Sequence, residues 1–321
     1  MKTIRWGIIG CGKVTEVKSG PAFQMAENSE LVAVMRRNAE LAKDYAQRHK
    51  AKYWHSDAQE LINNPEVDAI YIATPPAFHH EYALMAATAG KPTYIEKPFG
   101  LSYPQAKEMT NIFKKADIPI FVAYYRRALP RFVKIKSLIE QGAIGKVRFA
   151  DVLFYQKAAE ADQCGQHNWR VDPAISGGGY FVDLGSHTLD ILQYFLGNII
   201  SADGHASNQA EIYPAEDMVS GNFIFASGVH GTGIWNFSAY ADLDRTEIVG
   251  DQGKIVFATF GNSPVELHTK DGVQSLDLPN PVHIQLPLIQ SIVDDLNRKG
   301  QCPSTASTAL RTNWAMYKLR G

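Results

Sequence analysis

The sequence lacks long apolar runs, a strong net charge and an even set of cysteines. No apolar run reaches membrane-spanning length, and the N-terminus leads straight into a strand without an apolar leader. With 32 basic and 33 acidic residues the formal net charge is -1, which gives no reason to expect nucleic acid or a membrane as partner. The three cysteines, Cys11, Cys164 and Cys302, are far apart and odd in number, which favours a reducing compartment. We therefore expect a cytoplasmic protein.

The length of 321 residues and the hydrophobic content of 45% suit two domains. The first part alternates apolar strands with helical stretches, which predicts a doubly wound parallel sheet. Its expected strands are 4–9, 31–35, 52–54, 69–73, 93–95 and 118–123, and its expected helices include 39–48 and 58–63. We therefore expect an α/β fold with a dinucleotide-binding Rossmann domain over residues 1–123.

The pattern changes after residue 123. A helix over 130–141 and a strand over 146–154 are followed, from residue 201 onward, by mainly strand-like sequence with Gly and Asp-Gly turns. This predicts an α+β domain over residues 124–321 with a large, mostly antiparallel sheet that is open on one face. Open sheet faces often bury against a copy of themselves, so we expect a homodimer or homotetramer formed through this face.

A glycine-rich turn follows the first expected strand. Residues 7–15 read GIIGCGKVT and match the dinucleotide fingerprint, except that Thr15 stands where a third glycine or alanine is usual. Glycine at positions 10 and 12 lets the backbone turn tightly and lets a pyrophosphate approach the next amides. A glycine pattern alone is weak, but a strand precedes it and a second strand arrives at the expected interval. The cofactor-binding positions expected here are Gly10, Gly12, Lys13 and Val14.

The end of the second strand carries arginines. Where NAD-binding sequences place an acid for the ribose hydroxyls, this chain has Arg36 and Arg37. A guanidinium offers a forked, charged donor to a 2′-phosphate, and such hydrogen bonds contribute about 1.5–3 kcal/mol, or roughly ten- to a hundredfold in affinity. The alternative is that both arginines only solvate the loop. We expect NADP(H) to be preferred over NAD(H).

Lys97 is the first catalytic candidate. It follows the expected strand 93–95, and Pro98 after it cannot continue a strand, so the chain turns there. Ligands of open parallel sheets bind outside the carboxyl ends of the strands, although a surface lysine could stand at the same place. Thr74 and Pro75 close the strand 69–73 at the same edge and are expected to line the nicotinamide pocket. His79, five residues on, is interpreted as a loop or capping residue near the cofactor rather than a metal ligand, and no metal site is expected.

A second informative stretch is predicted as a helix over residues 180–196. Asp183, His187 and Asp190 share one face of that helix by their spacing, while the other faces are largely apolar. Polar side chains on a buried helix must be hydrogen-bonded or functional. A structural Asp–His pair that holds core helices together is an open alternative to a catalytic one.

Together, these motifs resemble the family of glucose–fructose oxidoreductase, inositol dehydrogenase and MocA, here the Gfo/Idh/MocA family. The resemblance rests on Gly10-Cys11-Gly12, on Glu96-Lys97-Pro98, and on the spacing of Asp183, Gly185, His187 and Asp190 after Gly179, and it covers essentially the whole chain. It implies a nicotinamide-dependent dehydrogenase or reductase for a carbinol or carbonyl of a sugar, inositol or sugar-like substrate. Thr15 and Arg36 depart from the usual pattern.

The resemblance also implies roles for single residues. Lys97, Asp183 and His187 become the catalytic group, Glu96 lies against the nicotinamide ribose, and a cis peptide bond precedes Pro98. A histidine titrates near neutrality and can transfer the hydroxyl proton, while a lysine can stabilise a developing alkoxide. Which of His187 and Lys97 transfers the proton is open, as is whether Asp183 orients the histidine or holds a substrate hydroxyl.

Positions near these motifs supply the expected walls of the substrate pocket, which are Tyr125, Arg126, Trp169 and Arg170 together with Asp183 and His187. A loop anchor is an equal interpretation for Trp169 and Arg170. Two other functions compete with the dehydrogenase. One is a redox-neutral glycosidase or lyase that retains NAD, and the other is a non-catalytic sensor that binds NADP(H). Arg36 weighs against the first, and the complete set of proton-transfer groups weighs against the second.

Overall fold

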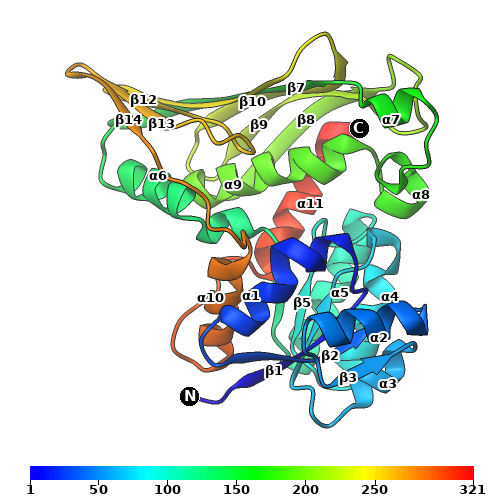
Figure 1. The fold of residues 1–321 in the computed structure, drawn as a ribbon. Coiled ribbons are helices and arrows are strands. Elements are labelled where there is room, and N and C mark those ends of the chain that lie inside the picture. The colour runs from blue at the N-terminus through cyan, green and yellow to red at the C-terminus, as the bar shows by residue number, and fades with distance from the viewer. The chain divides into compact units, whose positions relative to one another are not determined.

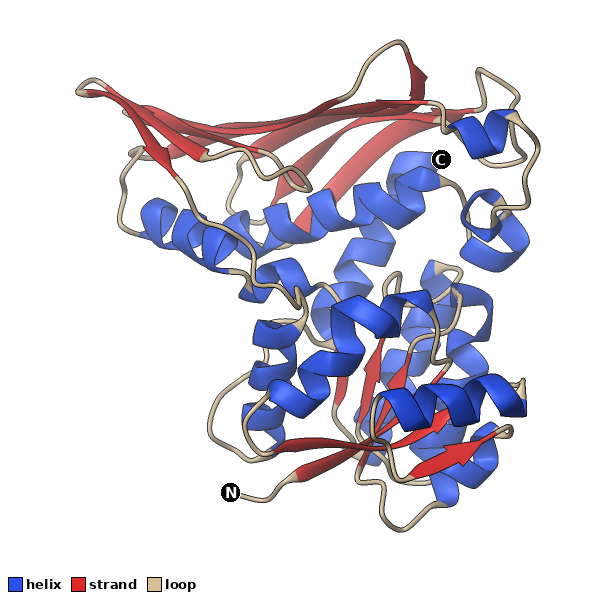
Figure 2. Cartoon of the chain, in the orientation of Figure 1, coloured by secondary structure: helices blue, strands red, loops and turns tan.

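The computed structural model describes residues 1–321, which divide into two compact units. Unit 1 comprises Met1–Leu129 and Pro281–Leu310, and unit 2 comprises Pro130–Asn280 and Arg311–Gly321. The elements are labelled in Figure 1, and Figure 2 distinguishes helices from strands. Each unit has its own sheet, so the two are described in turn.

Unit 1 is built on a six-stranded, entirely parallel sheet in the order β3-β2-β1-β4-β5-β6. The strands are β1 (Ile4–Ile9), β2 (Ser29–Met35), β3 (Tyr53–His55), β4 (Ala69–Ile72), β5 (Thr93–Ile95) and β6 (Ile120–Val122). All residues of β4 and β5 are buried, as expected of strands covered on both faces. The strand order reverses its direction between β1 and β4, and such switch points are where open α/β sheets bind ligands.

Capped helices connect these strands. They are α1 (Gly20–Met25), α2 (Ala39–Arg48), α3 (Ala58–Asn63), α4 (His79–Thr88) and α5 (Tyr103–Ala116). The side chains of Asn38, Asp57 and Ser102 accept hydrogen bonds from backbone amides at the starts of α2, α3 and α5. The structure thus confirms the predicted alternation of strands and helices, with α2 and α3 at the predicted bounds.

The chain returns to unit 1 after residue 280. Helix α10 (Leu286–Leu296) packs against α1 and buries Leu288, Ile289, Ile292 and Val293. Beyond it, Ser304 exchanges two hydrogen bonds with the backbone of Val122 at the edge strand β6. Residues 281–310 therefore cluster with unit 1, whereas the sequence-based division placed everything after residue 123 in one domain. The expectation that the chain is mainly strand-like to its end misses α10 and α11 (Ala306–Arg320), because both follow a run of seven strands.

Unit 2 is built on an eight-stranded sheet in the order β14-β13-β12-β11-β7-β10-β9-β8. The strands are β7 (Val147–Lys157), β8 (Ile199–Ser207), β9 (Met218–Phe225), β10 (His230–Ala239), β11 (Leu243–Gly250), β12 (Gly253–Phe257), β13 (Val265–Thr269) and β14 (Gly272–Leu276). Only β7 and β10 pair in parallel, which confirms the predicted, mostly antiparallel sheet.

Helices cover one face of this sheet. They are α6 (Pro130–Glu140), α9 (Ser186–Leu196) and the last part of α11, with the short α7 (Glu160–Gln163) and α8 (Pro173–Ser176) at one end (Figure 1). Exposed and buried residues alternate along most of β10, so its other face carries side chains that no helix covers. The predicted open face is therefore present.

Candidate active site

The glycine turn follows β1 directly and is shaped by its neighbours. Gly10 has a φ of +91°, and a Cβ there would lie 2.7 Å from Cγ2 of Thr74, so no other residue fits. A Cβ on Gly12 would meet nothing closer than 3.8 Å, which leaves open space beside its backbone. The turn thus offers a cradle of the kind that a pyrophosphate fills, and a dinucleotide fits it.

The side chain of Thr15 forms two hydrogen bonds with the backbone of this turn. Its Oγ1 accepts a hydrogen bond from the amide of Gly12 at 2.9 Å and donates one to the Gly12 carbonyl at 2.8 Å. The side chain is fully buried, and the hydroxyl of Tyr45 donates to the Thr15 carbonyl at 2.8 Å. The departure from glycine at this position therefore stabilises the loop. Lys13 is exposed and Val14 partly buried in the first helical turn, where amides have no carbonyl of their own helix to bind.

The two arginines after β2 differ in their surroundings. Both are exposed, but the Arg37 guanidinium lies over the ring of Phe78, 5.2 Å from its centroid. Arg36 makes a backbone hydrogen bond to His55, and no hydrogen bond or ion pair is made by its side chain. Arg36 is thus the arginine with a guanidinium available to a ligand.

The turn after β5 holds Glu96 and Lys97. Glu96 is 8% exposed, and its Oε1 accepts hydrogen bonds from the Tyr71 hydroxyl at 2.6 Å and from Nε2 of Gln285 at 2.7 Å. Lys97 is half-buried. The peptide bond between Lys97 and Pro98 is cis, as the resemblance implied. The glycine turn meets Thr74 at the end of β4, and β5 pairs with β4, so Lys97 leaves the same edge of the sheet.

His79 links two of these turns. It is fully buried, with Nε2 2.9 Å from the Thr74 carbonyl and Nδ1 3.0 Å from the Pro98 carbonyl. Burial lowers the pKa of its imidazole to about 4, so it is neutral at physiological pH. A neutral imidazole has one N–H, so His79 donates to one of these two carbonyls and packs against the other, between the turn after β4 and the turn after β5. A direct contact with the cofactor stays a prediction.

Tyr125 and Arg126 follow β6 in a short 3-10 turn and are both buried. The Arg126 guanidinium lies 5.0 Å from the centroid of the Tyr125 ring. Burial opposes ionisation of this tyrosine, but the positive charges of Arg126, Lys18 and Lys97 outweigh burial and lower the pKa of its hydroxyl. Lys97 is thus one of three positive charges near the Tyr125 hydroxyl, and the Glu96 carboxylate opposes them in part.

In unit 2, Asp183 lies in a π-helical turn, Phe181–Gly185, that leads into α9. The predicted helix over 180–196 is thus confirmed, with a wider first turn. Asp183 is 20% exposed at its side chain and pairs with Arg170, whose Nε lies 3.4 Å from Oδ2. The Arg170 guanidinium also lies 4.5 Å from the centroid of the Trp169 ring. The structure therefore brings three predicted site residues of unit 2 together.

The polar face of α9 serves two purposes. His187, near its start, is 3% exposed and meets the Phe260 ring edge to face, with centroids 5.8 Å apart. Asp190 is 1% exposed and accepts a hydrogen bond from the Thr312 hydroxyl at 3.2 Å. Gln193 in turn donates to that hydroxyl at 3.1 Å. Asp190 thus joins α9 to α11 through a threonine, whereas the structural alternative in the sequence analysis was an Asp–His pair.

Two groups of side chains escaped the sequence analysis. In unit 2, Asp162 accepts hydrogen bonds from the Tyr180 hydroxyl at 2.6 Å and from Asn168 at 2.9 Å, and so anchors the loop that carries Trp169 and Arg170. In unit 1, Gln285 reaches Glu96 from a segment 189 residues away. Neither spacing forms a known motif, so no pattern in the sequence could have indicated them.

Comparison with known proteins decides the family. Residues 4–124 match a model described as an oxidoreductase family with an NAD-binding Rossmann fold, and residues 132–256 match a model of the GFO/IDH/MocA C-terminal domain. Oxidoreductase P35 of Formosa agariphila is 40% identical over 291 residues, which cover 90% of each chain. The chain belongs to the Gfo/Idh/MocA family. The family membership that the three motifs indicated is thereby confirmed.

Other Gfo/Idh/MocA proteins agree with this assignment. An NAD(+)-dependent scyllo-inositol 2-dehydrogenase of Bacillus subtilis is 25% identical over 316 residues, 97% of this chain and 89% of the relative. The solved structure of levoglucosan dehydrogenase in complex with NADH and levoglucosan has the same fold, with a TM-score of 0.87 at 22% identity over 98% of this chain and 96% of that one. The chain is therefore a nicotinamide-dependent oxidoreductase of the dehydrogenase and reductase type. None of its helices is both long and apolar enough to cross a membrane.

Proposed function

We propose that this protein is an NADP(H)-preferring oxidoreductase that transfers a hydride between nicotinamide and a carbinol or carbonyl of a sugar, inositol or sugar-like substrate. The observation that carries the proposal is the shared sheet edge in unit 1. There the glycine turn contacts Thr74 at the end of β4, and the adjacent strand β5 delivers Lys97. The names of two relatives, which act on scyllo-inositol and levoglucosan, support polyols and sugars as the substrate class.

The residues in unit 1 that would hold the dinucleotide are Gly10, Gly12, Lys13, Val14, Arg36, Arg37, Thr74, Pro75, His79, Glu96 and Lys97. The bound nicotinamide supplies the hydride acceptor or donor at its C4. The positive charge of Lys97 would stabilise the negative charge that develops on the substrate oxygen. This electrostatic role suits a half-buried cation on a rigid turn.

The proposed proton chemistry draws on unit 2. His187 would take the substrate hydroxyl proton during oxidation and return it during reduction. Asp183 would orient that histidine or hold a neighbouring hydroxyl, with its carboxylate already held by Arg170. Trp169, Arg170, Tyr125 and Arg126 would form the walls of the substrate pocket.

The preference for NADP(H) rests on Arg36. Its exposed guanidinium is available to a 2′-phosphate, whereas Arg37 is engaged with the Phe78 ring. No acid stands at the end of β2 to repel that phosphate. Charged hydrogen bonds of this kind favour NADP(H) by roughly ten- to a hundredfold.

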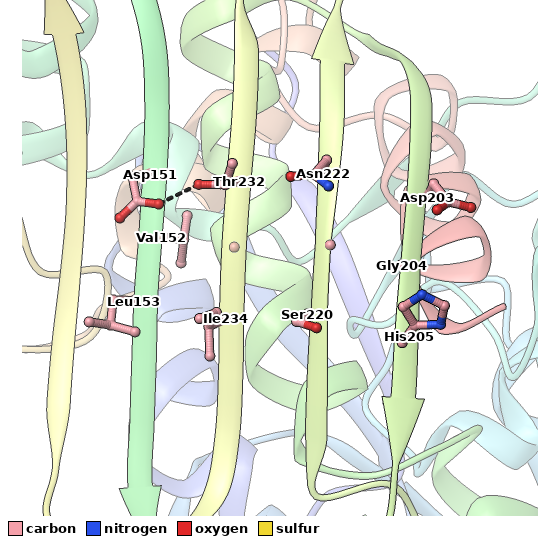
Figure 3. A pocket seen from close by; sticks show the side chains of 12 residues that line it. Asp151, Val152, Leu153, Asp203, Gly204, His205, Ser220, Asn222, Thr232 and Ile234 are labelled. Carbon is pink, nitrogen blue, oxygen red and sulfur yellow. Dashed lines mark hydrogen bonds between the residues drawn. The ribbon is translucent and has the colours of Figure 1, made fainter.

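The open sheet face of unit 2 supports a homodimer or homotetramer. Its outward side chains line a groove of about 460 Å³, with Asp151, Asp203, His205, Ser220, Asn222 and Thr232 around Leu153 and Ile234 (Figure 3). Phe149 is 46% and Ile234 42% exposed on outward positions of neighbouring strands. A second copy of this face would cover these apolar groups. Light scattering of the wild type and of Ile234→Lys tests this, and a monomeric wild type would refute it.

The function is tested by nicotinamide absorbance with a panel of sugars, polyols and dicarbonyl sugars, using NADP(H) and NAD(H) in parallel. Wild type is expected to turn over at least one compound, faster with NADP(H), and Lys97→Met is expected to be nearly inactive. Turnover that survives Lys97→Met would refute the mechanism. No net change of nucleotide with any compound would favour the redox-neutral glycosidase or lyase, or the sensor.

A further inference from the structure

A buried chain of hydrogen bonds supports the turn that carries Lys97. The Tyr94 hydroxyl donates to Oε1 of Gln285 at 2.7 Å, and Nε2 of Gln285 donates to Oε1 of Glu96 at 2.7 Å. The Tyr71 hydroxyl donates to the same Glu96 oxygen at 2.6 Å. All four side chains are at least nine-tenths buried, and the two tyrosine rings stack with centroids 4.8 Å apart. No water is needed to complete this chain.

The direction of these bonds is fixed by chemistry. An ionised carboxylate only accepts, and the primary amide of glutamine can donate to it while accepting from a hydroxyl at its other end. Burial raises the pKa of both tyrosine hydroxyls, Tyr71 and Tyr94, well above the usual value, so both stay protonated donors. Glu96 Oε1 therefore receives two donors and is held in one orientation. Its other oxygen, Oε2, lies 3.3 Å from the amide of Lys97.

Gln285 has no other evident reason to be buried here. It is the residue before α10, yet its side chain makes no capping hydrogen bond to that helix. Instead the side chain is 1% exposed and points to Glu96 and Tyr94. The segment 281–310 therefore does more for unit 1 than cover α1, because it delivers a polar group to the carboxyl edge of the sheet.

We propose that Gln285 is a positioning residue that fixes Glu96, and through it the Lys97 turn, in the geometry needed for hydride transfer. The proposal rests on the proposed role of Lys97. Without the amide, Glu96 would keep one donor on Oε1, the Tyr71 hydroxyl, and would be held less firmly. Small displacements of a catalytic group by about 1 Å can lower the rate by roughly a hundredfold.

The first variant is Gln285→Leu, which keeps a similar volume and removes both hydrogen bonds. Its kcat is expected to fall roughly 10- to 100-fold, while the KM for nucleotide stays within about threefold, because the glycine turn and Arg36 are untouched. The matched control is Gln290→Leu on the same helix. Gln290 accepts a hydrogen bond from the amide of Glu27 at 2.7 Å and does not touch Glu96, so kcat should not change.

The second variant separates positioning from packing. Gln285→Glu keeps the shape, but an ionised carboxylate at 285 cannot donate to Glu96, whereas a protonated one can. Two buried carboxyl groups at this distance raise each other's pKa and share one proton at lower pH. The ratio of variant to wild-type kcat is therefore expected to rise as the pH falls from about 8 to about 6. A loss of packing alone would give a ratio independent of pH. The other titratable and charged groups around this site are the same in wild type, and they are Lys18, Tyr71, Tyr94, Glu96, Lys97, Tyr125, Arg126 and Cys302.

A third measurement needs no substrate. The emission of NADPH bound to Gln285→Leu should differ from that of NADPH bound to wild type and to Gln290→Leu, because Glu96 is expected beside the nicotinamide ribose. Unchanged emission together with unchanged kcat would overturn the proposal, as would a pH-independent ratio for Gln285→Glu. A wild type that turns over no substrate would refute the proposed function, and the emission would still decide the role of Gln285.

Discussion

The two sheets of this molecule place their chemistry differently. In unit 1 the strands β4 and β5 are buried throughout, and every candidate group stands in a turn at or beyond a strand end. In unit 2 the sheet carries no catalytic candidate, and Asp183 and His187 belong instead to the π turn and helix that cover one of its faces. Parallel strands that are covered on both faces leave only their ends for ligands, whereas an open sheet can use one face for packing and the other for a partner.

The largest expected effect is the loss of kcat when one catalytic candidate from each unit is replaced. Lys97→Met should lower kcat by about 10³-fold, because a fixed charge near the reacting oxygen is lost. His187→Asn should lower kcat by about 10²-fold and flatten its pH profile between pH 6 and 8, because the titrating group is lost. Steady-state kinetics from pH 5.5 to 9 test both variants.

Two exposed or partly exposed residues provide controls for that pair, Lys114→Met in unit 1 and His268→Asn in unit 2. Both should behave as wild type. If His187→Asn kept the full pH dependence, His187 would not be the proton-transfer group, and the proposed role of this residue would be wrong.

The next effect concerns unit 1 alone. Arg36→Asp should lower the NADPH/NADH affinity ratio by roughly ten- to a hundredfold, because a forked donor to the 2′-phosphate becomes a like charge. Fluorescence titration with both nucleotides measures the ratio. Arg37→Asp should change it less, since Arg37 is engaged with Phe78. An unchanged ratio in Arg36→Asp would remove the basis for the NADP(H) preference.

The two units also differ in how much of their structure could be predicted from the sequence. In unit 1 every strand pair except β1–β4 joins strands that are consecutive along the chain, so period and turn residues locate nearly every element, and the motif at Gly10 and Gly12 follows its strand directly. The contacts that the sequence did not predict in unit 1 join residues far apart along the chain. Neither Gln285 nor Ser304 belongs to a motif, and both contacts depend on a chain that returns after unit 2 is complete.

The sequence predicted the sheet of unit 2 but not the order of its strands. Alternation identifies β9 to β13, yet it cannot indicate that β7 lies between β10 and β11, because such pairings are set by packing over long separations. Spacing alone indicated the polar face of α9. That Asp190, unlike His187, accepts a hydrogen bond from Thr312 could not be predicted, because Thr312 lies on α11. Spacing within one helix carries no information about which neighbour it meets.

A smaller effect tests the closed face of the unit 2 sheet. A Cβ on Gly221 in β9 would lie 2.4 Å from Cδ2 of Leu319 and 2.5 Å from the Asp203 carbonyl. Gly221→Val should therefore destabilise the protein by roughly 1–3 kcal/mol through overpacking against α11. Ser220→Val, on the adjacent and outward-facing position, should stay within about 0.5 kcal/mol. Thermal midpoints measure both, and equal shifts would contradict the assignment of faces.

The smallest effect compares surface carboxylates of the two units. In unit 1, hydrogen bonds from Arg48 lower the pKa of Glu16 to about 2, and His49 adds a further contact at 2.8 Å. In unit 2, the Lys146 amide, aided by Arg148, lowers the pKa of Asp251. A depressed carboxyl pKa contributes stability that is present above the unfolded-state pKa and is lost as the pH falls toward the folded-state value.

Glu16→Gln should therefore lower the thermal midpoint at pH 7, and its difference from wild type should shrink as the pH falls from about 5 toward about 2. Asp251→Asn should behave alike with a smaller difference, because a single arginine hydrogen bond reaches Asp251, whereas two arginine hydrogen bonds and a histidine contact reach Glu16. Scanning calorimetry at pH 7, 5, 4 and 3 makes the comparison. A difference for Glu16→Gln that stays constant with pH would mean that the charge of Glu16, and hence its pairing with Arg48, contributes nothing to stability.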